Sequence, residues 1–211
     1  MNKQFELELQ SVIEKYPDLS IRKKTDGSGY LKGILNIPDD LGRIAGSFSI
    51  EIHSTSTFPY RYPKVYEVGG DIPIEADWHK YDDNSCCLTV EQKELIDCHY
   101  GIILIHFVEK IVIPYFANQI YRKATGHYLN EYPHGLYGIK MFYSDLFGSH
   151  DINFWKTCVI NCFTKGKFER NHKCYCGSGK KFKHCHLPIE EKLQMLGKEK
   201  VMNDLKRIFL L

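Results

Sequence analysis

The chain has 211 residues and a net charge of +2, with 13% aromatic and 26% charged residues. This length suffices for one ordinary domain with a small appendage, and the composition excludes a disordered chain. So small a net charge does not by itself indicate a protein that binds nucleic acid. No secretory signal pattern is visible, so we expect a cytoplasmic protein whose eight cysteines are reduced and serve metal binding or chemistry.

The first half of the sequence predicts a helix followed by four strands. The helix covers Asn2 to Tyr16 and ends before Pro17. Strand patterns follow at residues 19–24, 30–38, 47–54 and 65–68. A long structured loop from Asp71 to about Asp97 comes next.

The most apolar segment, residues 101–116, predicts a buried helix within residues 100–123. His106, Glu109 and Lys110 interrupt it, so it falls short of the ~18 apolar residues that a membrane span needs. We therefore expect no association with membranes.

The second half predicts helices at residues 135–148 and 151–163, a basic linker at residues 164–173, and one final helix at residues 188–211. The expected fold class is α+β. The expected domains are residues 1–125, a helical extension at residues 126–166, and a metal-binding tail at residues 167–211.

The most specific signal is the cluster "KCYCGSGKKFKHCH", residues 173–186. Cys174, Cys176, Cys185 and His186 offer three thiolates and one imidazole, a donor set typical of a closed tetrahedral zinc site. His184 could replace His186 as the fourth ligand. The alternative interpretation is that the four residues bind no metal and are unrelated residues of a basic tail. The cluster resembles the SEC-C zinc motif, which implies zinc as cofactor and a role in docking a protein rather than nucleic acid.

The second signal is "DWHKYDDNSCCL", residues 77–88, where adjacent cysteines end a polar loop. Adjacent cysteines do not easily pair with each other, and this loop has no second cysteine at a metal-ligand spacing. Cys86 and Cys87 are therefore inert buried thiols, ligands of a site completed elsewhere, or a nucleophile. Cys98, which precedes a histidine, is a further candidate nucleophile.

The order of elements in residues 1–125 resembles the ubiquitin-conjugating enzyme fold. The segment "FPYRYPKV", residues 58–65, is similar to the family's proline-rich element, His79 stands where its motif has histidine, and Cys87-Leu88 matches its catalytic pair. The resemblance implies a thioester on Cys87. Lys80 and Tyr81 replace the family's Pro-Asn after the histidine, and Asn84 is the candidate for the missing amide.

The chain also resembles bacterial conjugating-enzyme homologues encoded in anti-phage operons with cyclic-oligonucleotide synthases. That resemblance implies a thioester with the C-terminus of the synthase as partner, followed by transfer to an amine. Asp82 and Asp83 are candidates for holding an incoming amine and taking its proton. We expect their joint replacement by asparagine to slow transfer and to spare thioester formation.

Three other functions are consistent with the sequence. The first is a non-catalytic binding module of the same fold that docks a partner through the zinc tail. The second is a small cysteine hydrolase, which needs a histidine oriented opposite the thiol. The third, a redox or zinc protein built on Cys86, Cys87 and Cys98, fits poorly because adjacent ligands strain tetrahedral geometry.

Overall fold

The computed structural model describes residues 2–164 and 169–210, and the chain forms two compact units. The first unit is Met1–Thr89 with Asp97–Glu131, and the second is Val90–Ile96 with Tyr132–Leu211. The sequence predicts three segments, whereas the structure places the helical extension and the metal-binding tail in one unit. Part of the expected linker, residues 165–168, lies outside the described residues.

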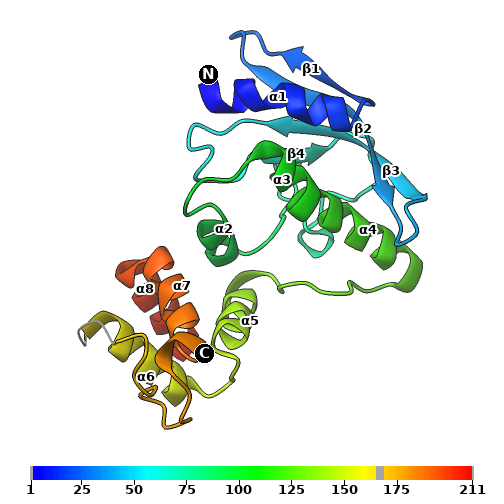
Figure 1. Ribbon diagram of the computed structural model, residues 1–211. Helices are drawn as coiled ribbons and strands as arrows, with labels where there is room; N and C mark the ends of the chain where they lie inside the picture. The colour runs from blue at the N-terminus through cyan, green and yellow to red at the C-terminus, as the bar shows by residue number, and fades with distance from the viewer. Residues whose placement is uncertain (1, 165–168, 211) are drawn as a thin grey trace. The chain divides into compact units, whose positions relative to one another are not determined.

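The first unit contains a four-stranded antiparallel sheet in the order β1-β2-β3-β4 (Figure 1). Helix α1 (Lys3–Lys15) precedes strands β1 (Leu19–Lys23), β2 (Gly29–Pro38), β3 (Ile44–His53) and β4 (Lys64–Glu67). The side chain of Asn2 caps α1 by accepting a hydrogen bond from the amide of Phe5. The predicted α+β class with an antiparallel meander is therefore confirmed.

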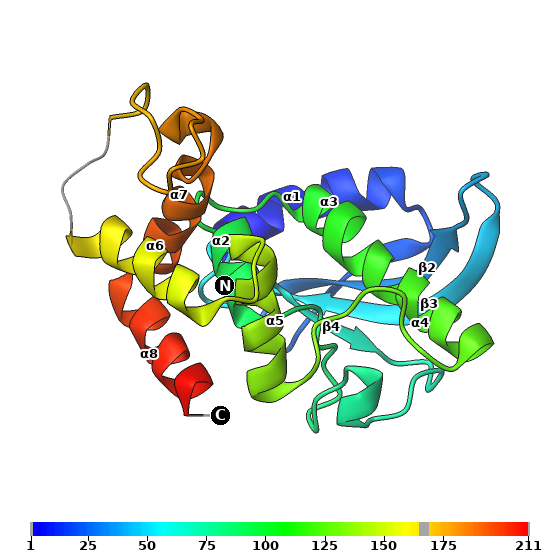
Figure 2. The same cartoon turned by 90° about the horizontal axis from the view of Figure 1, so that it is seen from below.

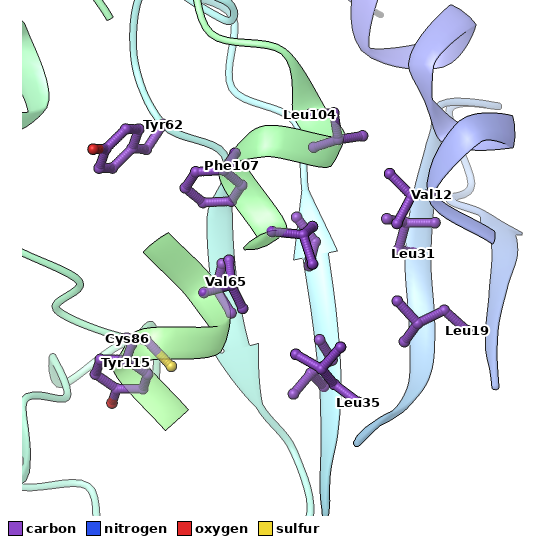
Figure 3. Packing of buried hydrophobic residues seen from close by; sticks show 14 of the residues in the cluster. Val12, Leu19, Leu31, Leu35, Tyr62, Val65, Cys86, Leu104, Phe107 and Tyr115 are labelled. Carbon is purple, nitrogen blue, oxygen red and sulfur yellow. The ribbon is translucent and has the colours of Figure 1, made fainter. Parts of the chain in front are cut away.

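One face of the sheet carries the core of this unit. Leu31 pairs with Ile52 and Leu35 with Phe48, so alternate residues of β2 and β3 place their apolar side chains on the same face. Helix α1 and the helical segment after residue 103 cover this face (Figure 3). The sheet is thus closed on one side by helices, while the hairpin described below attaches to β4.

The predicted helix at residues 100–123 begins later and is not regular. It consists of α3 (Leu104–Phe107), a wide π-helical turn (Val108–Val112) and α4 (Ile113–Thr125). Pro114 explains the wide turn, because a proline has no amide hydrogen and its ring collides with the carbonyl group four residues earlier. No helix in the described part of the chain has the length and apolarity needed to cross a bilayer.

The second unit is helical. Its helices are α2 (Glu91–Asp97, whose last residue belongs to the first unit), α5 (Gly135–Phe147), α6 (Ile152–Thr164), α7 (Leu187–Leu196) and α8 (Lys198–Phe209). Trp155 and Tyr143 are fully buried at its centre. The metal motif lies before α7 and contains a short 3₁₀ turn (Phe182–His184) (Figure 2).

One expectation about helices is wrong. The final helix is not continuous, because Gly197 adopts a φ of 82° and separates α7 from α8. The predicted structured loop at residues 71–97 contains a short 3₁₀ turn (Ala76–Trp78) and α2.

Candidate functional site

The loop that carries the paired cysteines is a hairpin fixed to the edge of the sheet. The amide of Cys87 donates to the carbonyl of His79 at 2.7 Å, and the amide of Tyr81 donates to the carbonyl of Ser85 at 2.9 Å. Asn84 adopts a φ of 65°, the left-handed conformation that asparagine tolerates in tight turns. The amide of Cys86 donates to the carbonyl of Val65 in β4 at 2.7 Å, which anchors the hairpin.

The three candidate nucleophiles differ in burial. Cys86 is 7% exposed and lies in the core beside the ring of Tyr115 (Figure 3), where burial raises the pKa of its thiol to about 11. Cys98 is fully buried. Cys87 is only half-buried, because successive residues of an extended segment point to opposite sides. Among the three, Cys87 is therefore the thiol best placed to meet a substrate.

His79 lies next to Cys87. It ends the 3₁₀ turn in the left-handed conformation, with a φ of 51°. One of its ring nitrogens lies within 4.8 Å of the Cys87 sulfur. Its Nε2 is hydrogen-bonded to a carboxylate oxygen of Glu131 at 2.5 Å, and the ring of Tyr128 packs edge-on at 4.9 Å. A thiol, an imidazole and a carboxylate are thus brought together.

One face of α4 holds the turn that carries His79. The side chains of Arg122, Gln119 and Tyr115 bind the carbonyl oxygens of residues 77, 78 and 79 respectively, the last two at 3.1 and 3.0 Å. These side chains are three and four residues apart and therefore share one face of the helix. Three consecutive carbonyl groups are fixed in this way, which leaves the backbone of His79 little freedom.

The resting form of Cys87 is a thiol. Partial burial raises the pKa of Cys87 above its usual value, and a hydrogen bond with Tyr81 offsets only part of this effect. Since the thiolate is the nucleophilic form, Cys87 needs a base to react at neutral pH.

The two aspartates of the loop have different surroundings. Asp83 accepts hydrogen bonds from Lys64 Nζ at 2.6 Å and from the amide and hydroxyl of Ser85 at 3.0 and 2.5 Å. These donors, the Lys64 ammonium first, lower the pKa of Asp83 to about 2. Asp83 is consequently a poor proton acceptor and belongs to the framework of the hairpin, although both aspartates are exposed.

Asn84 is directed to the sheet. Its side-chain amide donates to the carbonyl of Glu67 at 3.3 Å, which ties the turn to the end of β4. The amide group that the resemblance assigns to oxyanion binding is therefore engaged with the backbone.

A buried ion pair between Lys80 and Glu67 joins the hairpin to strand β4. Lys80 Nζ lies 3.4 Å from a carboxylate oxygen of Glu67, and the two side chains are 1% and 0% exposed. Lys80 also donates to the carbonyl of Glu67 at 3.2 Å, and the Glu67 carboxylate accepts from the amide of Gly69 at 2.6 Å. Lys80 therefore serves the framework and is turned to Glu67.

The four predicted metal ligands lie together in the second unit. The donor atoms of Cys174, Cys176, Cys185 and His186 all lie within 4.8 Å of one another. The Cys174 sulfur is 3.1 Å from His186 Nδ1, and the sulfurs of Cys176 and Cys185 are 3.5 Å apart. Ligands of a tetrahedral zinc ion lie roughly 3.5–3.8 Å apart. The donor set and its spacing thus fit one metal ion, with His186 in the cluster.

The local backbone explains how so short a segment brings these donors together. Gly177 and Gly179 have φ values of 76° and 72°, and the chain between them reverses so that the amide of Cys174 donates to the carbonyl of Lys180 at 2.8 Å. Helix α7 begins directly after His186.

The metal motif is packed into the helical unit. The ring of His186 lies 5.0 Å from that of Tyr175 and 5.4 Å from that of Phe154 in α6, and Phe182 is 2% exposed. The metal cluster is therefore continuous with the core of its unit.

Comparison with known proteins supports one of the two sites. Residues 170–188 match the family model of the SEC-C motif, which covers the four clustered donors. No curated protein and no solved structure matches the chain. The match shows the motif, and it covers only a short part of the chain.

Sequence reasoning missed Glu131 and the three α4 side chains. Glu131 is 52 residues from His79, so no spacing relates the two. A weak signal exists for α4, because Gln119 interrupts an apolar face and is fully buried in the structure. A buried glutamine requires hydrogen-bond partners, and this requirement alone points to a polar contact.

Proposed function

We propose that this chain is an acyl transferase of the ubiquitin-conjugating-enzyme type, which carries the C-terminus of a partner protein as a thioester on Cys87. The observation that carries the proposal is the half-buried sulfur of Cys87 with a ring nitrogen of His79 within 4.8 Å. The order of helix, four-stranded antiparallel meander, cysteine hairpin and long helix supports the same fold type.

The reaction has two halves. The Cys87 thiolate attacks the carbonyl carbon of an activated C-terminus, an acyl adenylate or a thioester, and the leaving group departs with its electron pair. An amine then attacks the new thioester, so that a C–N bond forms and the C–S bond breaks. The partner in this proposal is a cyclic-oligonucleotide synthase, and the process is anti-phage defence.

We propose zinc as the ion of the cysteine–histidine cluster and docking of the partner as the role of this unit. Three thiolates and one imidazole leave no open coordination position, which is typical of structural zinc. Zinc there supplies folding energy to residues 170–186, and the surrounding lysines present a cationic surface.

Cys87→Ala should abolish a thiol-labile adduct with the partner. The test is co-expression of the full chain with the product of the neighbouring gene, followed by reducing and non-reducing electrophoresis and mass spectrometry. Cys86→Ala is the matched control and should keep the adduct, because Cys86 faces the core. An adduct that persists in Cys87→Ala contradicts the proposal, and the lack of any adduct in the wild type favours the non-catalytic binding module.

Asp82→Asn should slow transfer of the acyl group to an amine by about tenfold or more, since positioned acid–base groups contribute roughly 10²–10⁴. Thioester formation should remain, because Asp82 acts on the incoming amine. Asp83→Asn is the comparison: it loosens the contacts with Lys64 and Ser85 and should weaken both steps. Single-turnover kinetics of the two steps separate these outcomes, and equal loss of both steps in Asp82→Asn would argue against its role.

A further inference from the structure

Three groups lie near one another at the hairpin. The Glu131 carboxylate is bound to Nε2 of His79, and a ring nitrogen of His79 lies within 4.8 Å of the Cys87 sulfur. We propose that these residues form a proton relay in which His79 takes the thiol proton of Cys87 and Glu131 positions the imidazole. This inference rests on the proposed acyl transfer through Cys87 and adds to it two residues with separate tasks.

The geometry favours a relay over a purely structural histidine. The backbone of His79 is already fixed by the hairpin and by Tyr115, so its ring is not needed to hold the turn. The ring is nevertheless oriented by a carboxylate from a segment 52 residues away. A base that is oriented by a third group beside a nucleophile is the arrangement found in cysteine and serine acyl-transfer enzymes.

The surroundings of Cys87 create the need for such a base. Burial raises the pKa of its thiol, and the buried Lys80 is paired with Glu67. An imidazole near pKa 6.5 is the side chain best matched to proton transfer at neutral pH. Glu131 stabilises the imidazolium that forms when the proton arrives.

The proton balance is simple. The S–H bond of Cys87 breaks, its electron pair stays on sulfur, and the proton bonds to the ring nitrogen of His79. The thiolate then forms the C–S bond with the activated carbonyl group. The imidazolium returns its proton to the departing group or to water, and Glu131 stays ionised throughout.

Other titratable and charged groups of the first unit lie near this part of the hairpin. The Tyr128 ring packs against the His79 ring, Tyr115 donates to the His79 carbonyl, and Tyr81 is hydrogen-bonded to Cys87. The guanidinium of Arg122 lies 4.7 Å from the centre of the Tyr128 ring. Glu131 is the charged group bound to the ring, and it favours the formation of imidazolium. Removing its carboxylate therefore removes this stabilisation.

The test follows the thiol and needs no partner. The full-length chain is alkylated with iodoacetamide between pH 5 and pH 10, and the modified Cys87 peptide is quantified by mass spectrometry, with fragment spectra to separate Cys86 from Cys87. In Glu131→Gln we expect the inflection of the pH–rate profile to rise by about one unit and the rate at pH 7 to fall about tenfold. In His79→Gln the inflection of the wild type should disappear, leaving only the titration of an isolated, partly buried thiol.

Glu75→Gln is the matched control, because it removes one exposed carboxylate from the same loop and should leave the profile unchanged. Circular dichroism checks that each variant is folded. Identical profiles for wild type and Glu131→Gln would overturn the relay, whether or not the adduct on Cys87 forms. A shifted profile without any adduct would support the relay and reject the proposed partner chemistry.

Discussion

If Cys174, Cys176, Cys185 and His186 hold a zinc ion as proposed, chelation is expected to unfold residues 170–186 and to leave the strands of the first unit intact. The segment is short, and its amide-to-carbonyl contacts lie between the clustered donors, so we expect these contacts to depend on the ion. Structural zinc contributes roughly 10–16 kcal/mol in comparable small motifs, so most of the local stability should depend on the ion. Hydrogen exchange measures this directly, with β2 and β3 as the internal reference.

Histidine variants provide a sharper version of the same test. His186→Gln removes a ligand and should weaken metal binding by more than about a hundredfold, because loss of even an outer contact costs 10–100-fold. His184→Gln is the matched control and should retain one ion per chain, since the cluster contains His186 Nδ1. Elemental analysis after dialysis against a weak chelator distinguishes the two, and retention of metal by His186→Gln would contradict the assignment.

Glu67→Leu is expected to destabilise the first unit by about 3–5 kcal/mol, because it leaves the ammonium group of Lys80 buried without its ionic partner. The carboxylate also accepts hydrogen bonds from the amides of Gly69 and Ile72, and these contacts are lost as well. Urea unfolding followed by the fluorescence of Trp78, in a Trp155→Phe background, measures the loss.

The double variant Glu67→Leu with Lys80→Met is the control. It removes both charges, so the unpaired ammonium no longer exists and part of the stability should return. The double-mutant cycle should give a coupling energy of about 1–3 kcal/mol. Purely additive losses would show that the pair contributes nothing beyond its separate contacts.

The sheet and the metal ligands are the parts that the sequence predicts best. Alternation of apolar residues such as Leu31, Leu35 and Ile37 determines which face of a strand is buried, and this pattern is local. The spacing of Cys174, Cys176 and Cys185 is equally local, because one tight turn suffices to bring the sulfurs together. Strand ends accordingly agree with the structure to within a few residues.

Other features depend on contacts between distant parts of the chain. Helix α2 has only seven residues, and its one buried residue is Gln92, so it lacks the apolar stripe by which helices are recognised. The contact of Glu131 with His79 and the orientation of Asn84 toward Glu67 arise from tertiary packing, which no spacing rule describes. The candidate nucleophile was identifiable from its motif, but the groups that would activate it were not.

The π-helical turn at Val108–Val112 sets the rotational phase between the two ends of its helix. Each residue of an α-helix advances the direction of the side chain by about 100°, so regular winding over these residues would rotate Tyr115, Gln119 and Arg122 away from the carbonyl groups that they bind. Leu104 and Phe107 would meanwhile keep their places in the core. Pro114, which favours the wide winding, thus helps to set the position of the His79 backbone through the helix face that binds it.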